Sequence, residues 1–155
     1  MPLYPDALVR IRTNLSMLET GQRPPVIAIG YFTPSQFREI NAAREHHRLP
    51  PIAENEIVFM GRHLFESRRL GNGYTIDDIL TQIQSAMSSS SRANVHSRMT
   101  AIENPAGRQD GYGNTVHDQA IFECTARKPR AELYSVIPEG DGLKRGMRIQ
   151  DRASR

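Results

Sequence analysis

The chain has 155 residues, of which 38% are hydrophobic and 24% are charged, so one globular domain with a modest core is expected. Its single cysteine, Cys124, excludes an internal disulfide and a cysteine-based zinc cluster, and is typical of a reducing, cytoplasmic setting. No apolar run reaches the roughly 20 residues of a membrane span, and no export signal follows Met1, so no membrane partner is expected. The net charge of +3 is compatible with a polyanionic partner without requiring one.

The pattern of the chain predicts one α+β domain over residues 1–141 and a basic tail over residues 142–155. The tail contains "LKRGMRIQDRASR", with five cations and one acid. Because it offers few apolar groups to bury, we expect it to add little to the stability of the domain.

The first half of the chain carries helical patterns. Between Asp6 and Gly21, apolar residues recur at helical spacing and predict an amphipathic helix. "RPPVIAIGYF" reads as a short extended link. Thr33, Pro34 and Gln36 then form a capping box with proline at the first helical position, which predicts a helix ending at "HHRLPP".

"EIVFMGRHLFESRRLGNG" is interpreted as mostly helix, although the run 57–60 fits a buried strand equally well. In a helix, His63 and Ser67 lie on one face with Arg62 and Arg68 to either side, an edge that favours anions.

The following segment carries the strongest helical signal of the chain. Thr75 caps a helix with Asp78 three positions on, and an apolar stripe continues to Met87. The serine run 88–91 reads as a flexible connector.

The second half of the chain has the two-residue periodicity of strands. "RMTAIEN", "NTVHDQAIFEC" and "AELYSVIP" predict three strands separated by turn segments. In the middle strand, one face is directed to a core and consists of Val116, Ala120, Phe122 and Cys124. The opposite face is polar except for Ile121, and its polar residues are Thr115, His117, Gln119 and Glu123. The fold class is therefore α+β, with N-terminal helices packed on a C-terminal antiparallel sheet.

The sequence contains no phosphate-binding GxxxxGK[ST], no GxGxxG after a strand, no HExxH, no GxSxG and no cysteine–histidine metal pattern. No cofactor and no metal are expected. His46 and His47 are adjacent and read as solvated residues at a helix end. His63 and His117, one in each half, can support RNA cleavage without metal, because histidine titrates near neutrality and suits both the base and the acid role.

The order of "GRHLFESRR", "YTIDDILTQIQSAM", "NTVHDQAIFEC" and "AELYSVIPEGD" resembles the layout of the barnase, EndoU, colicin and RelE-like RNase superfamily, particularly its phage and polyvalent-protein branch. The resemblance covers roughly residues 58–141 and is one of layout. It implies helices before a curved antiparallel sheet, and RNA cleavage without metal by a toxin or effector domain.

The resemblance also implies roles for individual residues. It matches His63 to the helical histidine, Arg68 to the phosphate cation, and Thr115 with His117 to polar positions on a strand. The candidate substrate-binding residues beside them are Arg62, Ser67, Tyr112, Asn114 and Gln119; the glycine-rich loop "DGYGN" would let a substrate backbone approach closely. RNA, with tRNA as a candidate, is the expected partner, and a cognate immunity or antitoxin protein is a second candidate partner.

Two alternatives remain open at this point. The same basic edge fits a module that binds nucleic acid without cutting it, and such binding would weaken strongly with salt. The chain is also compatible with an interaction protein of a mobile element that inhibits a partner enzyme.

Overall fold

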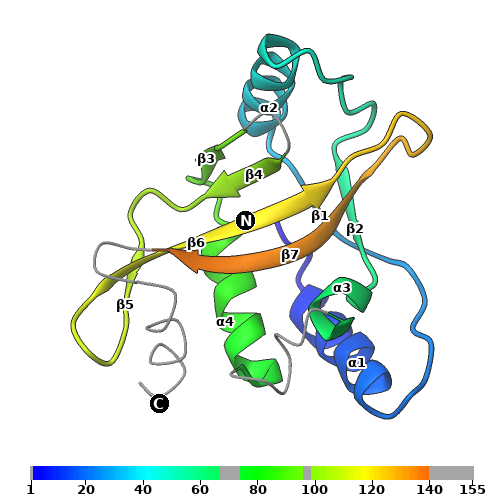
Figure 1. Ribbon diagram of the computed structural model, residues 1–155, viewed down its shortest axis with the longest axis vertical. Helices are drawn as coiled ribbons and strands as arrows, with labels where there is room; N and C mark the ends of the chain where they lie inside the picture. Colours follow the sequence, from blue (N-terminus) through cyan, green and yellow to red (C-terminus); the bar gives the residue numbers. More distant parts are fainter. Residues whose placement is uncertain (1, 67–73, 96–98, 140–155) are drawn as a thin grey trace.

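The computed structural model describes residues 2–66, 74–95 and 99–139 and confirms the α+β fold class (Figure 1). Helices dominate the first part of the chain, and the two longest strands lie near its end. The helices are α1 (Ala7–Glu19), α2 (Pro34–His46), α3 (Arg62–Glu66) and α4 (Ile76–Ala86). The strands are β1 (Ile27–Tyr31), β2 (Glu56–Phe59), β3 (Arg92–Ala93), β4 (Thr100–Glu103), β5 (Arg108–Gln109), β6 (Thr115–Glu123) and β7 (Ala131–Glu139).

One open sheet organises the molecule, in the order β1-β2-β7-β6-β4-β3, with β5 paired to β6. Neighbouring strands are antiparallel except β2 and β7, which run parallel. The parallel pair joins the early β1–β2 hairpin to the late strands that the sequence predicted. The sheet is therefore mixed and larger than the purely antiparallel sheet expected from residues 98–138.

The core lies where α1 and α4 pack against each other and against the sheet. α4 contacts β6 and β7, and Figure 1 shows it behind the two long strands. The inward positions of β6 alternate as the sequence predicted, with Val116, Ala120 and Phe122 buried. Because α1 and α4 occupy that side, the alternate residues of β6 are left on the opposite, open face.

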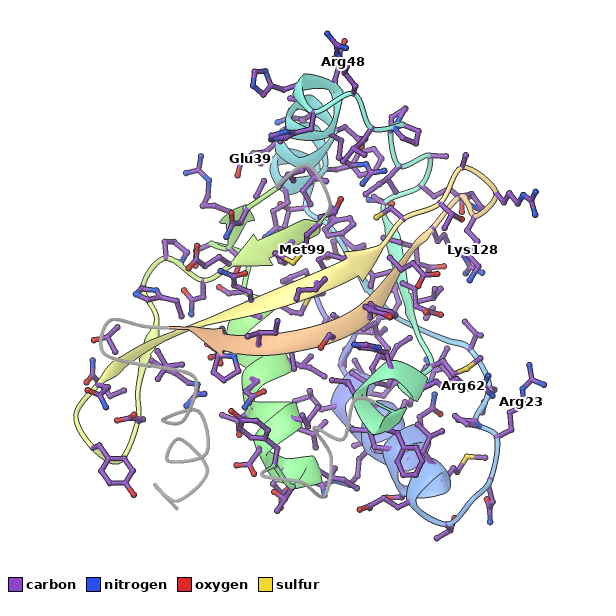
Figure 2. The ribbon with its side chains drawn as sticks, in the orientation of Figure 1. Arg23, Glu39, Arg48, Arg62, Met99 and Lys128 are labelled. Atoms are coloured by element: carbon purple, nitrogen blue, oxygen red, sulfur yellow. The ribbon has the colours of Figure 1, made fainter. Side chains whose placement is uncertain are left out.

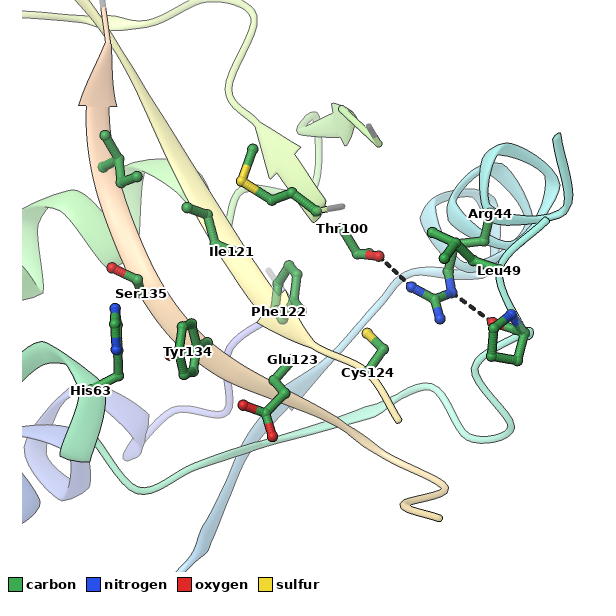
Figure 3. A pocket seen from close by; sticks show the side chains of 13 residues that line it. Arg44, Leu49, His63, Thr100, Ile121, Phe122, Glu123, Cys124, Tyr134 and Ser135 are labelled. Atoms are coloured by element: carbon green, nitrogen blue, oxygen red, sulfur yellow. Dashed lines mark hydrogen bonds between the residues drawn. The ribbon is translucent and has the colours of Figure 1, made fainter. Parts of the chain in front are cut away.

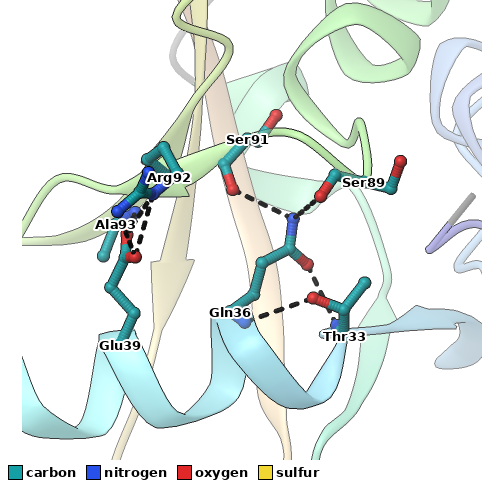
Figure 4. A network of polar contacts seen from close by, with 7 residues as sticks. All are labelled: Thr33, Gln36, Glu39, Ser89, Ser91, Arg92 and Ala93. Atoms are coloured by element: carbon teal, nitrogen blue, oxygen red, sulfur yellow. Dashed lines mark hydrogen bonds and ion pairs between the residues drawn. The ribbon is translucent and has the colours of Figure 1, made fainter.

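The predicted helix starts are confirmed, since both capping boxes form. The Thr33 hydroxyl accepts from the backbone N–H of Gln36, and Thr75 makes the same contact with Asp78. The Gln36 amide also donates to the carbonyl of Ser88 at 2.8 Å. Figure 4 shows its contacts with the carbonyls of Ser89 (3.5 Å) and Ser91 (3.1 Å). The serine connector, expected to be flexible, is thus a turn fastened to the first turn of α2.

The prediction of mostly helix over "EIVFMGRHLFESRRLGNG" is wrong for its first residues. β2 occupies 56–59, and α3 begins only at Arg62. The segment 27–31, expected to be an extended link, is likewise a strand, because it pairs with β2. Both segments are strands because each supplies backbone partners to the other, a tertiary effect that periodicity within a short apolar run does not reveal.

Some of the sequence-based predictions lie outside the described residues: Ser67, Arg68 and the tail 142–155. Within the described ranges, no helix combines the length and the apolar character that a membrane crossing demands.

Candidate active site

A groove of about 670 Å³ lies on the open face of the sheet (Figure 3). Its lining combines outward residues of β6 and β7 with Phe122 and Cys124, which have the inward phase of β6, and with the start of β4. The C-terminal end of α2 supplies one end of the groove, and α3 supplies the other. We call it the sheet groove. The residues that line it are Arg44, Leu49, Pro50, His63, Met99, Thr100, Ile121, Phe122, Glu123, Cys124, Tyr134, Ser135 and Ile137.

A second hollow of about 340 Å³ continues beyond His63, Glu123 and Tyr134, which line both cavities. We call it the outer lobe. It adds two exposed cations, Arg62 and Lys128, which lie on the same side of the molecule in Figure 2. The three shared residues therefore stand at the junction of two adjoining cavities, each of which carries positive charge.

An irregularity in β7 brings Tyr134 to this junction. The pairing of β6 with β7 steps from Ile121↔Ser135 to Phe122↔Leu133, so Tyr134 has no partner residue on β6. Such a β-bulge interrupts the alternation of the strand and redirects a side chain. Consequently Tyr134 and its neighbour Ser135 both line the groove.

The Tyr134 ring stacks on the imidazole of His63, with the ring centroids 3.8 Å apart and the planes 16° from parallel. α3 thus presents its histidine against β7, and the stack restricts how the imidazole can turn. Figure 3 shows the His63 ring beside β7, on the same side as Tyr134 and Glu123. The arrangement holds an imidazole and a carboxylate along one cavity.

Two glutamates face each other across the strands at this junction, because Glu123 of β6 is paired with Glu132 of β7. Side chains of directly opposite residues on antiparallel strands are about 5 Å apart at Cβ. Burial raises the pKa of Glu132; the nearby charge of Lys128 lowers it and that of Glu123 raises it further, and the net result is a raised pKa. Glu132 therefore keeps its proton to a higher pH than an ordinary glutamate.

The far end of the sheet groove holds a buried cation. Arg44 is only 4% exposed; its Nε donates to the carbonyl of Pro50 at 2.7 Å, and its Nη1 donates to the hydroxyl of Thr100 (Figure 3). Burial raises the pKa of the Cys124 thiol beside it, while the charge of Arg44 and a hydrogen bond from Thr100 act in the opposite direction. This end of the groove is positive and lined by a hydroxyl and a thiol.

Ser135 adds an uncommitted polar atom to the groove. Ser135 is 3% exposed, and its Oγ has no hydrogen-bond partner among the described residues. Buried hydroxyls are almost always hydrogen-bonded. The Ser135 hydroxyl is therefore available to a ligand in the sheet groove.

The structure does not bring His117 into this site. His117 is paired with Glu139, whereas the His63–Tyr134 stack lies next to the Phe122↔Leu133 pair, roughly 16 Å farther along the strand. His117 Nδ1 lies 3.0 Å from the carbonyl oxygen of Asn104. It occupies the polar face, as predicted, but it lines neither cavity.

The other predicted strand and loop residues also lie near His117. Thr115 accepts a hydrogen bond from Gln109, and Asn114 donates to Asp110 through its backbone and side chain. Gly107 packs so closely here that a Cβ on it would lie 2.8 Å from the Thr115 methyl and 3.2 Å from the His117 ring. The segment that leads into the β5–β6 hairpin thus packs against this end of the face, and neither cavity extends to it.

Gln119 lies half-buried between that end and the groove, and Tyr112 is exposed at the tip of the hairpin. Of the predicted residues that are described, His63 and Arg62 line the cavities. The structure brings these two together and leaves the other five on the hairpin side: Tyr112, Asn114, Thr115, His117 and Gln119.

Sequence reasoning placed Glu123 on the polar face without assigning it to the site, and it did not single out Arg44 or Tyr134. The signal for Arg44 was present, since it follows Ile40 by one helical turn and therefore shares the buried face of α2. The phase of β6 already put Glu123 on the open face. Nothing in the sequence announces the bulge at Tyr134.

Among the described residues, no group of three or more His, Cys, Asp or Glu side chains could hold a metal ion. Comparison with known proteins gives no match, since no family model, no curated protein and no solved structure is significantly similar to the chain. The case for function therefore depends on the geometry of the groove.

Proposed function

We propose that the protein is a metal-independent endoribonuclease of the toxin or effector kind, with its reacting groups at the junction of the sheet groove and the outer lobe. One observation carries the proposal: His63 and Glu123 line the same cavities, between the cation Arg44 at one end and the cations Arg62 and Lys128 at the other. An acid, a base and flanking positive charge are what cleavage of a phosphodiester through the 2′-hydroxyl requires.

We assign one proton-transfer role to each of the two side chains. The carboxylate of Glu123 takes the proton from a ribose 2′-hydroxyl, and the 2′-oxygen attacks the adjacent phosphorus. The bond from phosphorus to the 5′-oxygen breaks, and the leaving oxygen takes a proton from the imidazolium of His63. The products are a 2′,3′-cyclic phosphate and a free 5′-hydroxyl, so no atom from another reactant is consumed.

The neighbouring groups support these steps. The cations of the outer lobe counter the charge that builds up on the phosphate oxygens. Tyr134 holds the His63 ring by stacking. The order of segments in the sequence resembles that of the barnase, EndoU, colicin and RelE-like superfamily, and this resemblance supports the same reaction class. Glu123 takes the place of His117 as the partner of the helical histidine.

The test is incubation of the purified protein with total RNA or tRNA in EDTA, followed by gel analysis and identification of the new ends. We expect a cyclic phosphate product and a bell-shaped pH profile. His63→Ala and Glu123→Gln should each lower the cleavage rate by about 10²-fold or more, because general acid–base catalysis is typically worth 10²–10⁴-fold. Circular dichroism should show that both variants stay folded.

His117→Ala is the matched control, since it removes a histidine from the same face outside the cavities. It should keep the wild-type rate. If His117→Ala loses activity while His63→Ala and Glu123→Gln keep it, the assignment to the groove is wrong. If the wild type binds RNA in a salt-dependent way and leaves it uncut, the protein is a binding module and the proposal of catalysis fails.

A further inference from the structure

We infer that Arg44, at the end of the sheet groove farthest from the outer lobe, is the binding site for a phosphate group of the ligand. The inference names a ligand group for a part of the groove that the acid–base chemistry does not use. It rests on the proposed function only in assigning that phosphate to RNA.

Arg44 carries a buried charge without a carboxylate partner among the described residues. The side chain is 4% exposed, and no described carboxylate forms an ion pair with it. Its two hydrogen bonds go to the neutral oxygens of Pro50 and Thr100. A charge removed from water is costly unless an opposite charge is near, so an anion beside this guanidinium would supply what the protein itself leaves out.

Arg44 also keeps hydrogen-bond donors that its two described contacts do not use. A guanidinium has five N–H groups in a rigid plane. Two of those on Arg44 have acceptors among the described residues. These two bonds hold the side chain in place, and the remaining donors suit the paired oxygens of a phosphate.

The cavity around Arg44 offers further contacts to a ligand. Arg44 lines the same groove as the Ser135 hydroxyl, which is buried and has no described partner. Two apolar residues of β6 line the same cavity, Ile121 from the open face and Phe122 from the inward face. A ligand that fits this cavity has an anionic group at Arg44, a flat or apolar body against the apolar lining and a polar contact at Ser135. A nucleotide has these three parts, and a small inorganic ion does not.

Cys124 offers a direct readout, because it lies beside Arg44 and is the only cysteine in the chain. The positive charge of Arg44 favours its thiolate. An anion bound there would weaken that effect and block access, so both consequences slow alkylation of the thiol. The rate of modification by iodoacetamide, followed by mass spectrometry, therefore reports occupancy of the site without any RNA.

The experiment measures this rate with inorganic phosphate, with acetate and with chloride at equal ionic strength. We expect phosphate to slow modification of the wild type several-fold, and acetate and chloride to have little effect. Arg23→Gln, which removes an exposed arginine that lines neither cavity, should behave as the wild type. Arg44→Gln, measured against its own rate without phosphate, should lose the protection.

Arg44→Lys keeps the charge and loses the planar fork, so it should show weaker protection and serves as the test if Arg44→Gln fails to fold. Absence of phosphate protection in the wild type would overturn the inference, as would equal protection in wild type and Arg44→Gln. Stronger protection by acetate than by phosphate would overturn the assignment to phosphate. Protection by phosphate together with no RNA cleavage would refute the proposed function and support the phosphate site. RNA cleavage without protection would support the proposed function and refute the phosphate site.

Discussion

Replacing Arg108 by Gln tests a buried ion pair that supports the main strand of the site. Arg108 of β5 donates to both carboxylate oxygens of Asp118 on β6, from Nε at 2.7 Å and from Nη2 at 3.1 Å. The Asp118 side chain is fully buried, and that of Arg108 is 21% exposed. The pair lies on the face of β6 opposite the groove, so the substitution perturbs stability without touching the proposed reacting groups.

The magnitude follows from the burial of the acid. Removing one partner of a buried pair costs about 3–5 kcal/mol, because the buried carboxylate loses an opposite charge and its hydrogen bonds. The partial exposure of Arg108 lets some water reach the pair, which places the expected loss near the lower end, about 3 kcal/mol. For a chain of this size such a loss lowers the melting temperature by about 6–12 °C.

Thermal and urea unfolding followed by circular dichroism would measure this loss. Arg92→Gln is the control, since Arg92 also pairs with one carboxylate, that of Glu39, but its side chain is 70% exposed. Exposed pairs are typically worth less than about 1 kcal/mol. If Arg108→Gln and Arg92→Gln cost the same, the Arg108–Asp118 pair is not buried in solution and the reasoning is refuted.

Two further substitutions give distinct signatures. Burial raises the pKa of Glu132 above its ordinary 4.5; the charge of Lys128 opposes this rise and that of Glu123 adds to it. The protonated Glu132 side chain therefore contributes stability below pH 4.5, and this contribution is lost as the pH rises through the raised pKa. The melting temperature of Glu132→Gln should therefore rise relative to that of the wild type as the pH increases from 4 to 7. A difference in melting temperature that does not change with pH would contradict this. Gly30→Ala would place a Cβ 2.0 Å from the carbonyl oxygen of Pro2, so we expect a loss of about 1–3 kcal/mol and faster proteolysis of the N-terminal segment; unchanged unfolding and proteolysis would show that this contact does not form.

The capping boxes and the strand phase were predictable because the groups concerned lie within a few residues of one another. Thr33 and Thr75 each bond a backbone N–H three positions on, and that geometry is the same in any fold. Alternation in β6 placed Glu123 and His117 on one face before any partner strand was known. These predictions needed only the local period of the chain.

The extent of the sheet required tertiary information. The apolar run 57–60 fits a buried helix and a buried strand equally well. Its conformation depends on pairing with β1 and β7, which lie far from it in the sequence. The parallel pairing of β2 with β7 is also what brings α3, and with it His63, against the late strands. No local pattern contains that contact.

The candidate site, too, was predictable in part from the sequence and in part only from the tertiary structure. The sequence by itself determined that a histidine in the first half and a polar strand face in the second were the candidate partners. Tertiary structure decided which part of that face forms a cavity, because Gly107 packs against His117 and the bulge leaves Tyr134 without a partner on β6, stacked on His63. It also decided that Arg44 ends beside Cys124. A bulge depends on the register between two strands, and burial of a cation depends on what packs over it, so neither is a property of the residues nearby in the chain.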